Sequence, residues 1–208
     1  MRGNHAKEKE FNFISVLKII LVFAIIGAIV FFAMNVINNM NENTRNKEIV
    51  DNVINTSFNA LKNSDKENIN KYLDYNKLVA GLDEMLIKEK NNNEFDQELF
   101  KNISWSIESC DVKKDEATAI IELTNKNFKN ILTKWMKELI NEVNNGNEID
   151  EDVSIHKLEN IIKNETETKT ELKKIKVKMY EDTWKIVVND DLIDLVFPGI
   201  DAITKILN

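Results

Sequence analysis

The chain has 208 residues, with 28 Lys and Arg against 35 Asp and Glu, and its one cysteine excludes an intrachain disulfide. Past residue 39, 24 basic residues stand against 33 acidic ones, a formal charge of −9. Such an acidic surface argues against nucleic acid as a partner, because the neutralisation of phosphates supplies most of that affinity. The length leaves room for one soluble domain besides a membrane segment.

Residues 19–37 are the most apolar stretch of the chain and contain a single polar side chain, that of Asn35. As a helix this stretch would span roughly 28 Å at ~1.5 Å per residue, close to the hydrocarbon thickness of a bilayer. Soluble helices rarely run this long without a polar face. The end of the stretch also lacks the small residues at which signal peptides are cleaved. We therefore predict an uncleaved transmembrane anchor at 19–37 that binds the lipid bilayer.

The basic residues around the stretch predict its orientation. More of them precede it than follow it closely: Arg2, Lys7, Lys9 and Lys18 against Arg45 and Lys47. By the positive-inside rule, residues 1–18 form a cytoplasmic tail. Residues 38–46 are then a polar stalk, and residues 47–208 form an extracytoplasmic domain. The abundance of Asn, Lys and Ile is typical of AT-rich bacterial genomes, so we expect a protein of the bacterial cell membrane.

Helical periodicity dominates the first part of the domain. Apolar residues at three- and four-residue steps predict a helix that buries Ile49, Val50, Val53, Ile54, Phe58 and Leu61. This helix could continue the membrane helix outward with little break. Ser64 and Glu67 form a capping box that predicts the start of a second, short helix. Two more helical segments are expected at residues 78–86 and 95–100.

From residue 103 the apolar period changes to two, which predicts strands. A first hairpin is expected from residues 103–107 and 117–123, and a second from 175–179 and 184–188, turning at Glu181 and Asp182. Thr170 and Leu172 lie on the opposite parity to Ile175, which predicts a β-bulge near Lys173. Helices are predicted between the hairpins, at 128–143 and 153–162.

This order of elements predicts an α+β domain in which a curved antiparallel sheet packs against helices. The inner face of the sheet is expected to carry Trp105, Ile121, Val177 and Trp184. Part of that face would be covered by the helix that contains Trp135. These five residues are the candidates for lining a pocket, although large apolar residues at such positions more often form simple core.

Three short segments carry a family resemblance. They are Phe-Asn-Ala-Leu-Lys at 58–62 ahead of Ser64, Lys-Val-Lys-Met at 176–179, and Glu-Asp-Thr-Trp-Lys-Ile at 181–186. Together they resemble the nuclear-transport-factor-2-like (cystatin-like cone) superfamily, in particular its small membrane-anchored bacterial extracytoplasmic members. In those proteins an aromatic residue followed by Lys and Ile opens the last strand. The resemblance covers residues 47–188, and the insertion at 125–164 departs from the simplest family pattern.

The resemblance implies a cone-like sheet with a concave pocket or a dimerisation surface. Members of the superfamily range from isomerases and dehydratases to accessory domains without catalysis, so fold alone does not decide function. No phosphate-binding loop, nucleophile motif or carboxylate pair is visible in the sequence. His156 has no second histidine or cysteine at ligand spacing, and Cys110 lies beside Asp111, which disfavours a reactive thiolate. We expect neither a metal nor a cofactor.

Two hypotheses follow for the function. The first is a non-catalytic ligand-binding or protein-interaction domain in the bacterial envelope, whose partner is another envelope protein or further copies of the chain. By analogy of architecture it would be an assembly component of a secretion or conjugation machine. The alternative is a small enzyme, similar to an isomerase or dehydratase, that uses the concave pocket of the cone.

Overall fold

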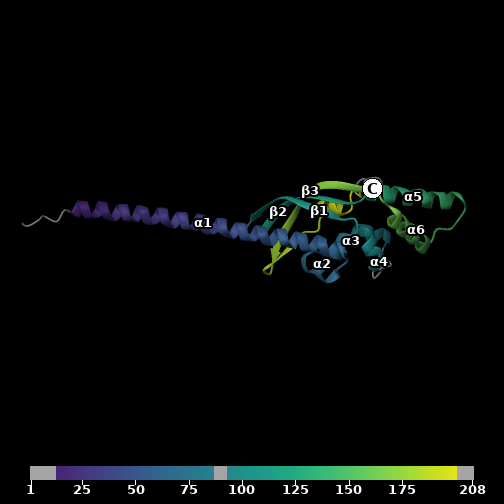
Figure 1. The fold of residues 1–208 in the computed structure, drawn as a ribbon, viewed down its shortest axis with the longest axis horizontal. Coiled ribbons are helices and arrows are strands. Elements are labelled where there is room, and N and C mark those ends of the chain that lie inside the picture. The colour runs from purple at the N-terminus through teal and green to yellow at the C-terminus, as the bar shows by residue number, and fades with distance from the viewer. Residues whose placement is uncertain (1–12, 87–92, 201–208) are drawn as a thin grey trace, which may run out of the picture. The chain divides into compact units, whose positions relative to one another are not determined.

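The computed structural model describes residues 13–86 and 93–200, and the chain divides into two units, Met1–Thr44 and Arg45–Asn208. Residues 1–12, in the predicted cytoplasmic tail, lie outside the described residues. Helix α1 (Phe13–Lys62) begins in the first unit and ends in the second (Figure 1). The predicted stalk at 38–46 is therefore helical and belongs to α1.

In the first unit, described side chains begin at residue 27, and α1 exposes most of its large apolar ones there. Between 41% and 71% of the surface of each is exposed for Ile29, Val30, Phe31, Phe32, Met34, Val36, Ile37 and Met40. Within the described part of the chain, no helix reaches the length and hydropathy of a membrane span. The predicted anchor at 19–37 begins among side chains outside that description, so the anchor stays a prediction.

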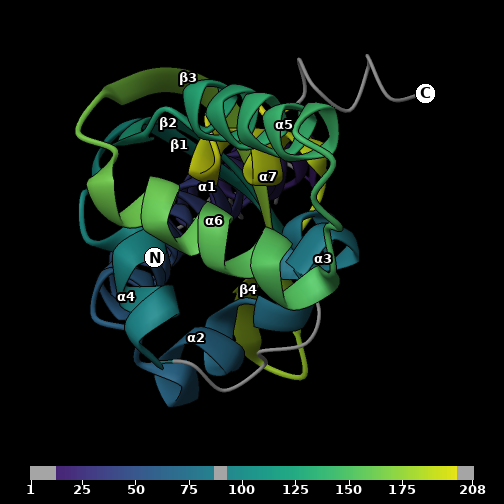
Figure 2. The same cartoon turned by 90° about the vertical axis from the view of Figure 1, so that its right-hand side faces the viewer.

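The second unit is an α+β fold with one antiparallel sheet in the order β1-β2-β3-β4. The strands are β1 (Ser104–Lys113), β2 (Glu116–Lys126), β3 (Thr168–Tyr180) and β4 (Thr183–Ile186). The shorter helices, seen in Figure 2, are α2 (Lys66–Tyr72), α3 (Tyr75–Leu86), α4 (Asn93–Phe100), α5 (Phe128–Asn144), α6 (Glu151–Asn164) and α7 (Asp190–Val196). The predicted α+β class with an antiparallel sheet and both predicted hairpins are confirmed.

Tight turns connect the strands within each hairpin. In the β3–β4 turn both central residues are left-handed, with φ of 47° at Glu181 and 63° at Asp182. A two-residue turn of this kind has the twist that matches the right-handed twist of the flanking strands. In the β1–β2 turn Lys114 has a φ of 55°. The charged turn residues therefore fix the register of both hairpins.

One face of the sheet packs into the core. On it Ile121 and Val177 are fully buried and Trp184 is 3% exposed, while Trp105 is half-buried, which confirms the predicted inner face. The end of α1, from Val50 onward, packs into this core, and the ring of Phe58 lies 5.5 Å from that of Trp105 between centroids. Helix α7 contacts β2 and β3.

The β-bulge lies in β1 and not in β3, so its predicted position near Lys173 is wrong. The pairing of β1 with β2 shifts between Ile107 and Ser109, whereas β2 and β3 pair without a shift along their whole ladder. Leu172 simply faces outward and is 59% exposed. The prediction failed because it required this leucine to be buried, and burial of apolar residues is not obligatory.

The start of α2 also differs from the prediction by one residue. The N-cap is Asp65, whose side chain accepts a hydrogen bond from the backbone N–H of Asn68. Ser64 instead adopts a left-handed conformation with a φ of 54°. Asp and Ser are comparably good N-caps, so the side chain that can reach the free N–H groups of the first turn takes the role.

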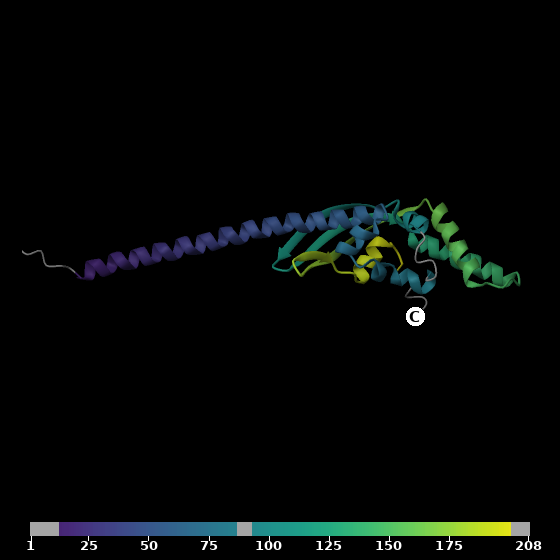
Figure 3. The ribbon, with the colours of Figure 1, turned by 90° about the horizontal axis from the view of Figure 1, so that it is seen from below.

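Helices α5 and α6 form the connection between the neighbouring strands β2 and β3 and extend from the end of the sheet (Figure 3). The backbone N–H of Asn127 donates to the carbonyl of Glu167 at 2.9 Å and closes the base of this insertion. The fully enclosed residues of α5 are confined to its first turns: Phe128, Ile131 and Leu132. Towards its C-terminal end, Ile140 and Val143 are 56% and 62% exposed.

Candidate ligand-binding groove

A groove of about 710 Å³ lies between the α2–α3 segment and the β3–β4 hairpin. Its apolar floor is formed by Leu73, Ile186 and Val188, which are 1%, 4% and 4% exposed. Its volume is within the range of about 300–1,000 Å³ that is typical of ligand sites. The groove lies beside β4 because α2 packs against this strand.

Helix-end geometry holds one wall of the groove in place. The N–H of Leu73 donates to the carbonyl of Ile69 at 2.7 Å and ends α2. Asp74 follows directly, and its carboxylate accepts a hydrogen bond of 3.0 Å from the backbone N–H of Lys77 at the start of α3. Asp74 and Lys77 are thereby fixed close together beside the groove.

Charged side chains of both signs line the groove. Asp74 and Lys77 come from the helical wall, and Glu181 and Lys185 from the hairpin. Among the described residues, none of these four side chains forms an ion pair. Tyr180, which is 51% exposed, lines the same groove. The groove thus offers an apolar surface together with charges that have no ion-pair partner within the described part of the domain.

The five predicted pocket residues lie elsewhere. Ile121 and Val177 are in the core, and Trp105 donates its indole N–H to the side chain of Asn55 at 2.8 Å. Trp135, in α5, donates to the carbonyl of Ser154 in α6 at 2.9 Å.

The fifth, Trp184, is buried, and its indole N–H has no hydrogen-bond partner among the described residues. None of the five lines the groove. The groove residues form no motif in the sequence, because they come together only through the packing of α2 against β4.

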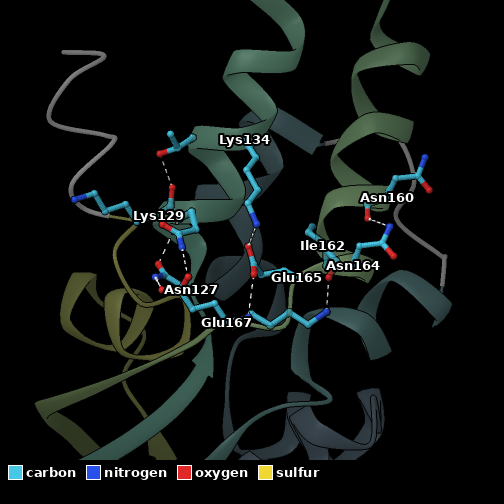
Figure 4. A network of polar contacts seen from close by, with 11 residues as sticks. Asn127, Lys129, Lys134, Asn160, Ile162, Asn164, Glu165 and Glu167 are labelled. Carbon is cyan, nitrogen blue, oxygen red and sulfur yellow. Dashed lines mark hydrogen bonds and ion pairs between the residues drawn. The ribbon is translucent and has the colours of Figure 1, made fainter.

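A second polar cluster, shown in Figure 4, joins α5, α6 and the start of β3. Glu167 accepts hydrogen bonds from the side-chain amides of Asn127 and Asn130, at 3.0 and 2.7 Å. The carboxylate of Glu165 accepts from Nζ of Lys134 at 2.8 Å and from the N–H of Glu167 at 2.9 Å. Burial favours a higher pKa for Glu165, but these hydrogen bonds outweigh it and hold the pKa below its usual value. The cluster stabilises the base of the helical insertion.

Lys126, at the end of β2, is fully buried. Its ammonium group bonds to the carbonyl of Ile162 and lies 3.3 Å from a carboxylate oxygen of Glu98. Burial is the main cause that lowers the pKa of Lys126, and the charge of Lys101 adds to it, while Glu98 opposes both. The amine lies outside the groove lining, so its arrangement is that of an internal ion pair.

Replacing Lys126 by methionine is expected to cost clearly less at neutral pH than the about 3–5 kcal/mol that follows when one partner of a buried ion pair is removed. Glu98 keeps Lys101 as a partner, and the carbonyl of Ile162 keeps the N–H of Glu165. The folded-state pKa of Lys126 lies below its unfolded value of about 10.5. At a pH between these two values, the folded wild type binds fewer protons than the unfolded wild type. The stability of the wild type relative to the methionine variant therefore rises as the pH increases through this range.

Urea denaturation between neutral pH and about pH 10.5 measures this difference. Lys157→Met is the matched control, because Glu142 raises the pKa of Lys157. The stability that Lys157 contributes is lost only as the pH rises above the unfolded pKa of about 10.5, so below that pH its substitution should not change how stability depends on pH. A Lys126→Met curve that runs parallel to the wild type would contradict the assignment.

The described residues contain no group of three His, Cys, Asp or Glu side chains placed to hold a metal. His156 is exposed, with its Nδ1 3.3 Å from the carboxylate of Glu159. Burial, followed by the nearby charge of Asp51, raises the pKa of Cys110 to about 11, so its thiol stays protonated at neutral pH. Comparisons with protein-family models, with curated proteins and with solved structures found no match for this chain.

Proposed function

We propose that the chain is a single-pass protein of the bacterial cell membrane, with a cytoplasmic N-terminus and an extracytoplasmic α+β domain. The domain has a non-catalytic role in binding a ligand or protein, and it belongs to the nuclear-transport-factor-2-like type. Its partner is another envelope protein or a further copy of the chain, as in a component of a secretion or conjugation machine.

The exposed apolar side chains of α1 support the membrane anchor. Residues 29–37 present large apolar groups that are 41% or more exposed, and they continue the apolar sequence that begins at residue 19. Each such side chain left in water forgoes about 1.5–3 kcal/mol of transfer free energy. Contact with lipid would recover this free energy along the whole stretch.

The groove is the observation that carries the binding role. Ligand sites are typically concave and mostly apolar, with a few charged or polar groups that orient the ligand. Here Leu73, Ile186 and Val188 form the apolar part, while Lys77 and Glu181 represent the two signs of charge at its edge. A partner that supplies the opposite charges would find both an apolar surface and ion-pair partners.

The membrane anchor is tested by placing charge within it. In the Val30→Asp, Phe31→Asp double variant we expect the chain to leave the membrane fraction, because each aspartate at a helix centre costs about 2.5–3.5 kcal/mol on insertion. Asn41→Asp with Asn43→Asp is the control, since these aspartates fall in the predicted stalk. In intact spheroplasts, added protease should digest the wild-type domain and spare an N-terminal tag. A protected domain, or a soluble wild-type chain, would contradict the proposed topology.

The binding role is tested by crosslinking in intact cells. A photoreactive phenylalanine at Tyr180 should give a specific adduct, whereas the same group at Leu172 should not. Both positions are exposed, by 51% and 59%, but Leu172 does not line the groove. The mass of the adduct distinguishes a second copy of the chain from a different envelope protein. Equal crosslinking from both positions, or none from either, would count against the groove.

A further inference from the structure

The last turns of α5 expose two large apolar side chains, which we call the apolar tip. They are Ile140 and Val143, and 56% and 62% of their surfaces are exposed. Residues three apart on a helix are neighbours, so the two side chains lie together on one surface of α5. Among the other large apolar residues described beyond Thr44, only Leu172 and Tyr180 are exposed by more than half, and both lie in β3. The tip is therefore the one place on this part of the chain where two such side chains of a helix are neighbours.

The apolar tip and the groove lie at opposite ends of the second unit. The insertion is closed at its base by the hydrogen bond from Asn127 to Glu167, and β3 begins at the next residue. Tyr180, the last residue of β3, lines the groove. The 13 residues of β3 span roughly 40 Å at ~3.3 Å each. Figures 1 and 3 show the β3–β4 hairpin at one end of the sheet and the insertion at the other.

Contacts between α5 and α6 hold the insertion in this direction. The indole N–H of Trp135 donates to the carbonyl of Ser154 at 2.9 Å. Closer to the tip, Nζ of Lys157 lies 2.7 Å from a carboxylate oxygen of Glu142. The insertion therefore projects away from the sheet, and the tip cannot reach the groove of its own chain. Only another molecule can bring an apolar tip to this groove.

The two surfaces are complementary in shape and polarity. The tip projects, whereas the groove is concave, with a volume of about 710 Å³ and an apolar floor that includes Leu73, Ile186 and Val188. An exposed apolar patch that fits a pocket elsewhere on the same molecule produces a contact between copies that joins two different surfaces. Insertion of Ile140 and Val143 would remove their surfaces from water and cover the floor of the groove.

The charges around the two surfaces are also complementary. Lys137 lies one helical turn before Ile140, and Glu148 lies just beyond the end of α5. Both side chains are exposed, and neither forms an ion pair among the described residues. The tip thus has a positive charge on one side and a negative charge on the other. The groove offers partners for each sign, namely Lys77, Lys185, Asp74 and Glu181.

We infer that the apolar tip of one copy docks in the groove of a second copy, so that the chains associate head to tail. This inference rests on the proposed binding role of the domain and names its partner. Each docked copy keeps a free groove or a free tip, so the contact can continue into a ring or a row of copies. Anchoring in one membrane would confine the copies together and raise their effective concentration, which favours a contact of this small size.

The test uses the purified full-length chain in phosphatidylcholine vesicles, with a photoreactive phenylalanine at position 180. No other protein is present, so any intermolecular adduct joins two copies. We expect a dimeric adduct whose crosslinked peptide contains residues 137–148, identified by mass spectrometry after proteolysis. The same group at Leu172, which does not line the groove, should give less of this adduct by on the order of tenfold or more.

Two variants separate docking of the tip from unspecific contact between apolar surfaces. Ile140→Ser with Val143→Ser should reduce the adduct from position 180 by on the order of tenfold or more, because the side chains that fill the groove are lost. Both residues are exposed, so this double variant is expected to fold. Leu172→Ser is the matched control, since it removes an equally exposed apolar side chain and should leave the yield unchanged.

Mixing two populations tests the direction of the contact. Copies that carry the photoreactive group and the double serine variant should crosslink to tagged copies with an intact tip. In the reverse mixture, copies with the photoreactive group and an intact tip should give no adduct that contains a tagged double serine variant. Equal yields from the two mixtures would overturn head-to-tail docking, and so would an adduct that maps to the groove of the second copy. An adduct that persists when both copies lack the tip would also overturn it.

Failure of this inference is distinguishable from failure of the proposed function. If position 180 gives no adduct in vesicles but crosslinks specifically to a different envelope protein in cells, the binding role stands and docking between copies is wrong. If position 180 gives no adduct in either setting, the groove itself is not a binding site. If the domain proves to face the cytoplasm, the proposed localisation fails, whereas the adduct in vesicles is unaffected.

Discussion

Replacing Phe197 by alanine is expected to destabilise the domain by about 3–5 kcal/mol. The side chain is fully buried just after α7, where its ring lies 4.9 Å from that of Phe128 and 5.9 Å from that of Phe100. These rings come from α5 and α4, so the truncation opens a cavity where three helices meet. Because whole domains are stable by only about 5–15 kcal/mol, a loss of this size is a large fraction of the total.

Urea denaturation of the detergent-solubilised chain, followed by tryptophan fluorescence, measures this loss. Phe197→Leu is the control, because it keeps most of the apolar volume and should cost clearly less than the alanine variant. A loss below about 1 kcal/mol for Phe197→Ala would show that the cavity closes by rearrangement and that Phe197 does not join the three helices.

The fold class could be predicted because it depends on local patterns. Alternation of apolar and polar residues identified the strands, and it placed Ile121 and Val177 on the buried face, where both are fully enclosed. The turn at Glu181 and Asp182 was recognisable because two charged residues interrupt the alternation between the strands, and Asp is common in turns. Each of these features is encoded within a few neighbouring residues.

The position of the β-bulge was also encoded in the sequence, but in a different strand. Trp105 and Ile107 lie on one parity and Cys110 and Val112 on the other, and the shift in register falls between the two pairs. The prediction instead followed Leu172, which is exposed. A change of parity among enclosed residues indicates a bulge, whereas a single apolar residue of the wrong parity does not.

The groove could not be predicted from local patterns. Asp74 and Lys185 are about 110 residues apart in the sequence, and they line one groove only because α2 packs against β4. Neither residue belongs to a motif, and a charged residue at a helix start or on the outer side of a strand is ordinary. Sites that depend on such long-range packing need the three-dimensional structure.

Replacing Gly199 by alanine is expected to destabilise the domain more than the same change at Gly146. Gly199 has a φ of 87°, and an added Cβ would lie 2.9 Å from Cβ of Lys129 in α5. The left-handed conformation costs an alanine roughly 1–2 kcal/mol. The close contact adds about 1–3 kcal/mol, because a Cβ atom is fixed by the backbone and cannot turn away.

Gly146, in the α5–α6 connection, separates the two contributions. Its φ is 77°, but an added Cβ would meet no atom within 4 Å, so Gly146→Ala should show only the conformational cost. At Gly199 the clash would also strain the hydrogen bond from the N–H of Phe128 to the carbonyl of Pro198, which is 3.1 Å long. Denaturation of both variants under the same conditions measures the difference. Equal losses would mean that the turn at 198–199 can move away from α5, and that its close packing against Lys129 contributes nothing to the stability of the domain.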